Sequence, residues 1–121
     1  MDKKTTILIV DDDLGMIETM TDILGDMGYD VDAAEDGYRA IEVVKEKEYD
    51  VALMDIKMPG INGVETFKWI KRVSPSTKVM MMTAYSVDDL INEALEEGAC
   101  GVMHKPLEIE KVVAFVEEMG K

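Results

Sequence analysis

The chain has 121 residues, 47% of them hydrophobic, which is enough for a single domain with a substantial core and argues against disorder. Its 26 acidic and 13 basic residues give a net charge of −13. This balance argues against direct binding to nucleic acid, because polyanions are held by clustered Lys and Arg. The single cysteine, Cys100, excludes a disulfide framework, and we expect it to be a small buried hydrophobic residue. No apolar run approaches about 18 residues, and the N-terminus lacks a signal-like apolar segment, so we expect a cytoplasmic protein without a membrane span.

Apolar residues along the chain alternate between strand spacing and helix spacing. A first strand is predicted at 6–10, and a helix follows over 16–27 with Asp13 as its N-cap and Gly28 as its end. Further strands are predicted at 30–34, 50–54, 79–82 and 101–104. Further helices are predicted to begin near 36, 64, 87 and 109. Five strands and five helices in strict alternation predict one α/β domain over 1–121, with a parallel sheet covered by helices on both faces.

Two apolar groups inside these elements bear on function and packing. The fourth helix is predicted to bury Val87, Leu90, Ile91, Ala94 and Leu95, and to end at Gly98. The run Met80-Met81-Met82 has the ligand type of a soft-metal site. Its position within a strand favours core packing instead, because methionine is a flexible filler of apolar cores.

Polar residues follow the predicted strands at the points where those strands end. Asp11 and Asp12 follow the first strand, Asp55 follows the third, Thr83 the fourth and Lys105 the fifth. Because the carboxyl ends of parallel strands lie along one edge of a sheet, we expect these side chains to meet there. The spacing does not decide which two of Asp11, Asp12 and Asp13 form an acidic pair. We choose Asp11 and Asp12, since Asp13 suits a helix cap.

These residue types fit the chemistry of a cation and a phosphoryl group. A carboxylate is a competent nucleophile toward phosphorus. Three crowded carboxylates repel one another, and Mg²⁺, which prefers oxygen ligands, would relieve that repulsion. Lys105 would favour the ionised form of Asp55. Each residue also has a plainer interpretation: Asp55 as a turn-opening acid, Thr83 as a strand-end hydroxyl, and Lys105 as a solvated loop lysine.

Taken together, four motifs resemble the receiver domain of two-component response regulators, of which CheY is the familiar example. They are the acidic pair, Asp55 in Met-Asp-Ile-Lys-Met-Pro-Gly, Thr83-Ala84, and Lys105-Pro106, in this order at the ends of alternate strands. The resemblance covers essentially the whole chain. It implies the flavodoxin-like (βα)5 doubly wound fold, with a five-stranded parallel sheet in the order 2-1-3-4-5.

The resemblance also implies a role for each matching residue. Asp55 would accept a phosphoryl group from a sensor histidine kinase. Mg²⁺ would be bound by Asp12, by Asp55, by the backbone carbonyl of Lys57, and by Asp11 through water. Thr83 would hydrogen-bond the phosphoryl oxygens, and Lys105 would pair with the phosphorylated aspartate. The neighbouring positions Lys57, Tyr85 and Ala84 would modulate the lifetime of the phosphoryl group or leave room for it, and the Lys105-Pro106 peptide is expected to be cis.

One position departs from the family pattern. Receiver domains usually carry Phe or Tyr three residues before the lysine, where this chain has Val102. Valine has no ring to swing inward as the threonine moves. We therefore expect the output change to be smaller, or to be carried by the fourth helix and its preceding loop, with Tyr85 as a candidate for part of the readout.

The partners implied are a sensor histidine kinase and an effector protein, or an output domain absent from this chain. The expected output surface is the face made by the fourth helix, fifth strand and fifth helix, with Glu93, Glu96, Glu97 and Glu110 exposed, and it can also serve homodimer formation. Such a chain is not an enzyme beyond its own phosphorylation and dephosphorylation. One alternative is a docking-only receiver. Another is a Mg²⁺-dependent phosphohydrolase, but such an enzyme would need a second acid two residues after Asp55, where this chain has Lys57. A flavin-binding protein of the same fold is disfavoured by the acidic first turn.

Overall fold

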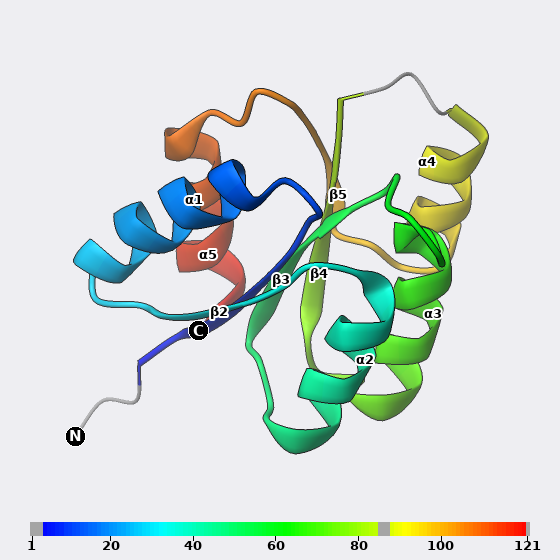
Figure 1. Ribbon diagram of the computed structural model, residues 1–121, viewed down its shortest axis with the longest axis horizontal. Coiled ribbons are helices and arrows are strands. Elements are labelled where there is room, and N and C mark those ends of the chain that lie inside the picture. The colour runs from blue at the N-terminus through cyan, green and yellow to red at the C-terminus, as the bar shows by residue number, and fades with distance from the viewer. Residues whose placement is uncertain (1–3, 85–87, 121) are drawn as a thin grey trace.

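A single parallel sheet forms the centre of the computed structural model, which describes residues 4–84 and 88–120. Its five strands stand in the order β2-β1-β3-β4-β5, as Figure 1 shows. Their bounds are Thr6–Val10 (β1), Asp30–Ala34 (β2), Val51–Asp55 (β3), Lys78–Thr83 (β4) and Gly101–His104 (β5). The predicted strand order and the alternating topology are confirmed.

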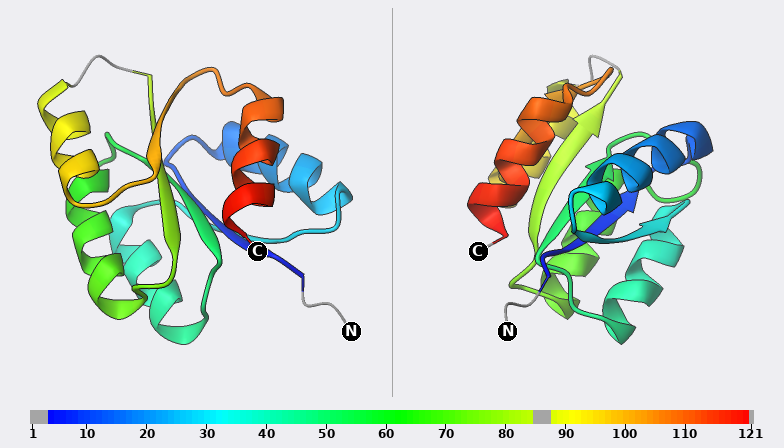
Figure 2. Two further views of the ribbon diagram at one scale, coloured as in Figure 1. Left: turned by 180° about the vertical axis from the view of Figure 1, so that it is seen from behind. Right: turned by 90° about the vertical axis from the view of Figure 1, so that its left-hand side faces the viewer.

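Five helices cover the two faces of this sheet. Helices α1 (Leu14–Asp26) and α5 (Ile109–Met119) lie on one face, and α2 (Gly37–Glu46), α3 (Gly63–Val73) and α4 (Asp88–Glu96) lie on the other (Figures 1 and 2). Within the described ranges, none of these helices has both the length and the hydropathy needed to cross a membrane.

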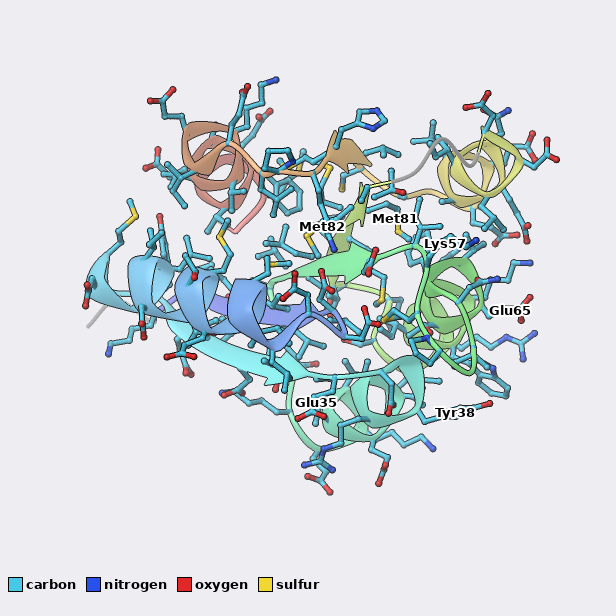
Figure 3. The ribbon with its side chains drawn as sticks, turned by 45° about the horizontal axis from the view of Figure 1, so that its top comes forward. Glu35, Tyr38, Lys57, Glu65, Met81 and Met82 are labelled. Atoms are coloured by element: carbon cyan, nitrogen blue, oxygen red, sulfur yellow. The ribbon has the colours of Figure 1, made fainter. Side chains whose placement is uncertain are left out.

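The strand sequences follow from this two-sided cover. Every residue of β1 and of β3 is buried, as expected for parallel strands with helices on both faces. Alternate side chains enter two separate cores. Met81 packs on the α2–α4 side and Met82 on the α1–α5 side, and Figure 3 shows these two side chains on opposite sides of β4. The methionine run therefore packs in the core, as the sequence predicts.

Helix ends follow the capping residues in the sequence. Asp13 accepts a hydrogen bond from Met16 N (3.2 Å) and Asp36 accepts one from Arg39 N (2.8 Å), the arrangement of an N-cap. Beyond α1 and α4, Gly28 and Gly98 have φ values of 95° and 104°. Glycine adopts this left-handed backbone at little cost, so it ends a helix cleanly. The prediction of Asp13 as a cap is confirmed.

Two predictions of burial are wrong. Cys100 is exposed, because it lies in the short connection between α4 and β5. Leu95 is 45% exposed, since α4 buries Ala94, and the next residue along a helix lies about 100° around its axis. The prediction for Val87 lies outside the described residues.

Candidate functional site

The acidic residues that follow β1 and β3 lie close together. Asp11 is fully buried, and its backbone N donates to Ala34 O (3.1 Å), which extends the ladder between β1 and β2 by one bond. Asp55 is the last residue of β3 and is 5% exposed, whereas Asp12 is exposed. One carboxylate oxygen from each of the three residues lies within 4.8 Å of the others. The structure thus brings together the acidic pair and the third acid expected from the sequence.

Lys105 contributes a positive charge to this cluster. Its backbone N donates to Thr83 O (2.8 Å), which places the lysine directly beyond β5. Its Nζ lies 2.6 Å from Asp11 Oδ2 and 3.5 Å from Asp55 Oδ2. The ammonium group therefore bridges the two buried carboxylates and sits closer to Asp11. The Lys105-Pro106 peptide is cis, as predicted.

The ionisation of Asp55 reflects its surroundings. Burial, followed by the charge of Asp11, raises the pKa of Asp55 to about 6, although the charge of Lys105 opposes the rise. For Lys105, burial acts to lower the pKa, but the hydrogen bond to Asp11 and the charges of Asp55 and Asp11 outweigh it and raise the pKa. One ammonium group thus compensates three clustered carboxylates incompletely.

This arrangement fits a hard divalent cation. The three carboxylates are the oxygen ligands that Mg²⁺ takes in proteins, and a site with few protein ligands suits an ion that keeps several waters. Asp11 Oδ2 is buried, and the group that faces it is the Lys105 ammonium, 2.6 Å away. Asp12 is open to solvent while Asp11 is engaged with Lys105, which suits direct binding by Asp12 and a less direct role for Asp11.

A cavity opens above the carboxylates at the carboxyl ends of the strands. Its lining includes Asp55, Lys57, Ala84 and Lys105, and Figure 3 shows Lys57 near the start of the loop between β3 and α3. Thr83, which precedes Ala84 at the end of β4, is fully buried. The carbonyl of Thr83 accepts from Lys105 N, but among the described residues Thr83 is not part of the cavity lining. The expectation for Tyr85 lies outside the described residues.

The lining also includes residues that were not predicted as site residues, among them Asn62 and Leu90. Asn62 lies in the cavity wall, and its side chain accepts a hydrogen bond from Glu65 N (2.9 Å), capping α3. Its sequence signal is an N-cap residue three positions before a glutamate. Leu90 was predicted only as a core residue, but it packs against the core and also lines the cavity. Helical spacing alone does not show which end of a helix reaches the site.

The surface predicted for output differs in detail from the prediction. Glu93 and Glu97 are half-buried and form ion pairs with Lys68 and Lys71 of α3. Glu96 and Glu110 are exposed, as predicted. Val102 is half-buried and packs against the core on the α2–α4 side. The acids of α4 thus divide between contacts with α3 and the open face.

Comparison with known proteins agrees with the family inferred from the site residues. The family model described as the response regulator receiver domain matches residues 7–117. The chain belongs to the response regulator receiver family. The chemotaxis protein CheY of Thermotoga maritima is 34% identical over 116 residues, which cover 95% of this chain and 97% of that protein. This confirms the resemblance inferred from the four motifs.

Another relative of this receiver is a longer protein. The transcriptional regulatory protein ZraR of Klebsiella oxytoca is 40% identical over 116 residues, which cover 96% of this chain and 26% of ZraR. The receiver thus spans about a quarter of the length of ZraR, so likeness to ZraR concerns its receiver portion.

Solved structures agree with the receiver fold. A CheY-like receiver domain protein from Methanospirillum hungatei has a TM-score of 0.92 at 28% identity, covering 96% of this chain and 93% of that one. The CheX–CheY–BeF₃–Mg²⁺ complex from Borrelia burgdorferi has a TM-score of 0.85 at 29% identity, covering 94% and 87%. The fold predicted from the sequence is therefore also that of known receivers.

Proposed function

We propose that this receiver is phosphorylated on Asp55 in a Mg²⁺-dependent reaction, with a histidine kinase as the donor. The observation that carries the proposal is the position of the Asp55 carboxylate. It lies at a cavity wall, 3.5 Å from the Lys105 ammonium and close to the oxygens of Asp11 and Asp12. A nucleophile, a positive charge and a cation site thus share one opening.

The chemistry of the step follows from these groups. A carboxylate oxygen of Asp55 attacks phosphorus, the bond from phosphorus to the donor imidazole nitrogen breaks, and the electron pair leaves with the imidazole. The product is an acyl phosphate on Asp55. The Lys105 ammonium remains positioned against the negative charge that builds up on the reacting oxygens, which is where a fixed positive charge lowers the barrier most.

The proposed Mg²⁺ site is made of oxygen donors. Asp12 and Asp55 would bind Mg²⁺ directly, together with the backbone carbonyl of Lys57, and Asp11 would act through water. When bound, the ion would neutralise the carboxylates and polarise the phosphoryl oxygens. The Borrelia burgdorferi CheY complex, which contains Mg²⁺ and BeF₃, supports this assignment by similarity. Lys57 and Ala84 line the same cavity, so they are the positions where side chains would alter the lifetime of the phosphoryl group, together with Tyr85.

Signalling would proceed by a shift between two arrangements around Thr83 and Lys105. Thr83 is buried at the end of β4, and Lys105 N donates to its carbonyl. A hydrogen bond from Thr83 to the new phosphoryl group would favour one arrangement over the other, as a population shift requires. We propose the face made by α4, β5 and α5 as the output surface toward an effector, an output domain or a second copy of the chain.

The proposal is tested by intact mass after incubation with acetyl phosphate, with and without Mg²⁺. We expect one hydroxylamine-labile phosphoryl adduct that requires Mg²⁺ and is absent from Asp55→Asn. Asp13→Asn is the matched control, because Asp13 is an exposed acid of the same opening that caps α1, and it should retain the adduct. No adduct on the wild-type protein under any condition would favour a docking-only receiver instead.

A further inference from the structure

Two glycines lie where the N-termini of α2 and α3 meet the segment that carries the phosphoacceptor. Gly37 is the first residue of α2 and Gly63 the first of α3, and both are buried. The segment between Asp55 and Gly63 includes Lys57, whose carbonyl is a proposed ligand. The packing of these two helix ends on that segment therefore bears directly on the site.

Gly63 rests against the backbone of the phosphoacceptor itself. Its N donates to Ile56 O at 2.7 Å. A Cβ at position 63 would lie 2.1 Å from Asp55 O and 2.8 Å from Ile56 Cα. Both atoms belong to the backbone of β3 and its exit, so a side chain at 63 could be accommodated only by moving Asp55 or the start of α3. The strands on both sides hold β3 in place, so the displacement would fall on the exit from β3 and the loop.

Gly37 lies against the C-terminal part of the same segment and the first turn of α3. A Cβ at position 37 would lie 2.1 Å from Thr66 Oγ1 and 2.6 Å from Ile61 Cγ1. Thr66 Oγ1 in turn donates to Asn62 O at 2.9 Å. A Cβ at position 60 would lie 3.0 Å from Tyr38 Cε2, and Figure 3 shows Tyr38 projecting from the N-terminal end of α2. The start of α2 thus packs against Gly60 and Ile61 of the loop and against Thr66 of α3.

We propose that Gly63 and Gly37 are positioning residues for the phosphoacceptor site: the close approach that they allow fixes where the Asp55 carboxylate and the Lys57 carbonyl lie. This inference rests on the proposed function. Neither glycine touches the reacting groups. Their effect would be exerted through the backbone at 55–57, which must stay in place for the carboxylates of Asp11, Asp12 and Asp55 to share one cation.

The first test compares Gly63→Ala with Gly25→Ala. Gly25 lies in α1, and an added Cβ there meets no atom within 4 Å, so it controls for a glycine-to-alanine change in a helix. The Mg²⁺ dissociation constant is measured from amide shifts of Asp12 and Asp55, and the phosphorylation rate with acetyl phosphate at saturating Mg²⁺. For Gly63→Ala we expect the dissociation constant to rise about 10- to 100-fold and the rate to fall up to about 100-fold, as a misplacement of about 1 Å produces. Gly25→Ala should leave both unchanged.

A purely structural role for Gly63 predicts something different. Gly63→Ala would then unfold at lower denaturant, but the folded protein would bind Mg²⁺ and react as the wild type does. That result would overturn the proposal. If the wild type itself neither binds Mg²⁺ nor forms the adduct, the proposed function fails rather than this inference.

Gly37→Ala keeps the test decisive if Gly63→Ala does not fold, because its Cβ meets side chains that can move or be removed. We expect a rise of a few-fold in the Mg²⁺ dissociation constant. In a Thr66→Ala/Ile61→Ala background, which removes the atoms it meets, Gly37→Ala should have no further effect. An unchanged dissociation constant for Gly37→Ala in the otherwise wild-type protein would overturn the proposal.

Discussion

Asp55 is held in a position that disfavours its own charge. Burial and the neighbouring Asp11 raise the pKa of Asp55 from 3.8 to about 6. Above pH 6, without a cation, the folded protein therefore holds an ionised carboxylate that would be better solvated in the unfolded chain. Linkage then makes this residue a source of instability that is full above pH 6 and disappears as the pH falls through 6 toward 3.8.

Asp55→Asn should accordingly stabilise the metal-free protein at pH 7. A shift of roughly two pKa units corresponds to about 1 to 3 kcal/mol of unfolding free energy. We expect a value in the lower part of this range, because Lys105 and Asp11 remain paired in the variant. The gain should shrink as the pH is lowered and vanish near pH 4. Urea unfolding at several pH values in EDTA measures it.

Asp13→Asn is the control for this prediction, since Asp13 is exposed and caps a helix. Asp13→Asn should change the free energy of unfolding at pH 7 only slightly, because asparagine caps a helix about as well as aspartate does. A destabilised Asp55→Asn protein at pH 7 without Mg²⁺ would contradict the account of Asp55.

At this scale the sequence predicts which residues meet, but not how they pair. The ends of β1, β3 and β5 follow from apolar runs, so the proximity of Asp11, Asp55 and Lys105 could be predicted. That Lys105 lies 2.6 Å from Asp11 and 3.5 Å from Asp55 depends on side-chain conformations, which strand spacing does not determine. The full burial of Thr83 could not be predicted for the same reason.

The edge strand β2 is tied to the rest of the fold by a polar cluster. Lys47 Nζ lies 3.0 Å from Asp30 Oδ2 and 2.9 Å from Asp32 Oδ2, and Tyr49 OH donates to Asp32 Oδ2 (2.7 Å). Hydrogen bonds from Lys47 and Tyr49 lower the pKa of Asp32, although burial opposes them. The cluster links two acids of β2 to the residues between α2 and β3. An edge strand carrying charged, paired side chains is also protected against pairing with other chains.

Asp32→Asn should lower the free energy of unfolding at pH 7 by up to about 1 kcal/mol, because the group is partly solvated. A lowered carboxylate pKa gives stability that is complete above the ordinary value of 3.8 and is lost as the pH falls through the lower folded value. The difference from wild type should therefore close below about pH 4. Asp22→Asn, on the exposed face of α1, is the control and should change little; an Asp32→Asn difference that persisted at pH 2 would contradict this account.

Val102 leaves the switch of this receiver without an aromatic ring at β5. Its side chain packs with Leu90 and Ile91 of α4 in one core. We expect BeF₃⁻ with Mg²⁺ to change the amide shifts of α4 and of the residues before it more than those around Val102. Backbone NMR with and without the mimic measures this, and the largest changes at Val102 itself would count against it.

The bounds of helices and strands were predicted correctly where the apolar residues follow a single spacing, that of a strand or that of a helix. The strands β1, β2 and β5 have the predicted bounds, and α5 begins at the predicted residue. Prediction failed for the burial of Leu95 and Cys100, because α4 is short and packs at the edge of the sheet with Ala94 as its only buried residue in the described part of the chain. Such a helix carries an apolar stripe wider than the surface that it covers.

Over the whole molecule, acidic residues outnumber basic ones two to one. Self-repulsion at a net charge of −13 should make the protein more stable as neutral salt screens it. Mg²⁺ should act differently, with a saturable gain of about 2.7 kcal/mol at one hundred times its dissociation constant. Thermal unfolding in KCl and in MgCl₂ at equal ionic strength separates the two effects. Asp12→Asn should remove the saturable gain alone, and an equal response to both salts would argue against a specific site.

The most direct test of the central claim is to locate the phosphoryl group. The protein is phosphorylated with acetyl phosphate and Mg²⁺, the acyl phosphate is reduced with borohydride, and the peptides are mapped by mass spectrometry. Reduction converts a phosphorylated aspartate to homoserine, so phosphorylation of Asp55 should give homoserine at position 55 and leave aspartate at 11, 12 and 13. Homoserine at any of those three positions, or none at 55 in a protein that carries the adduct, would contradict the assignment of Asp55 as the phosphoacceptor.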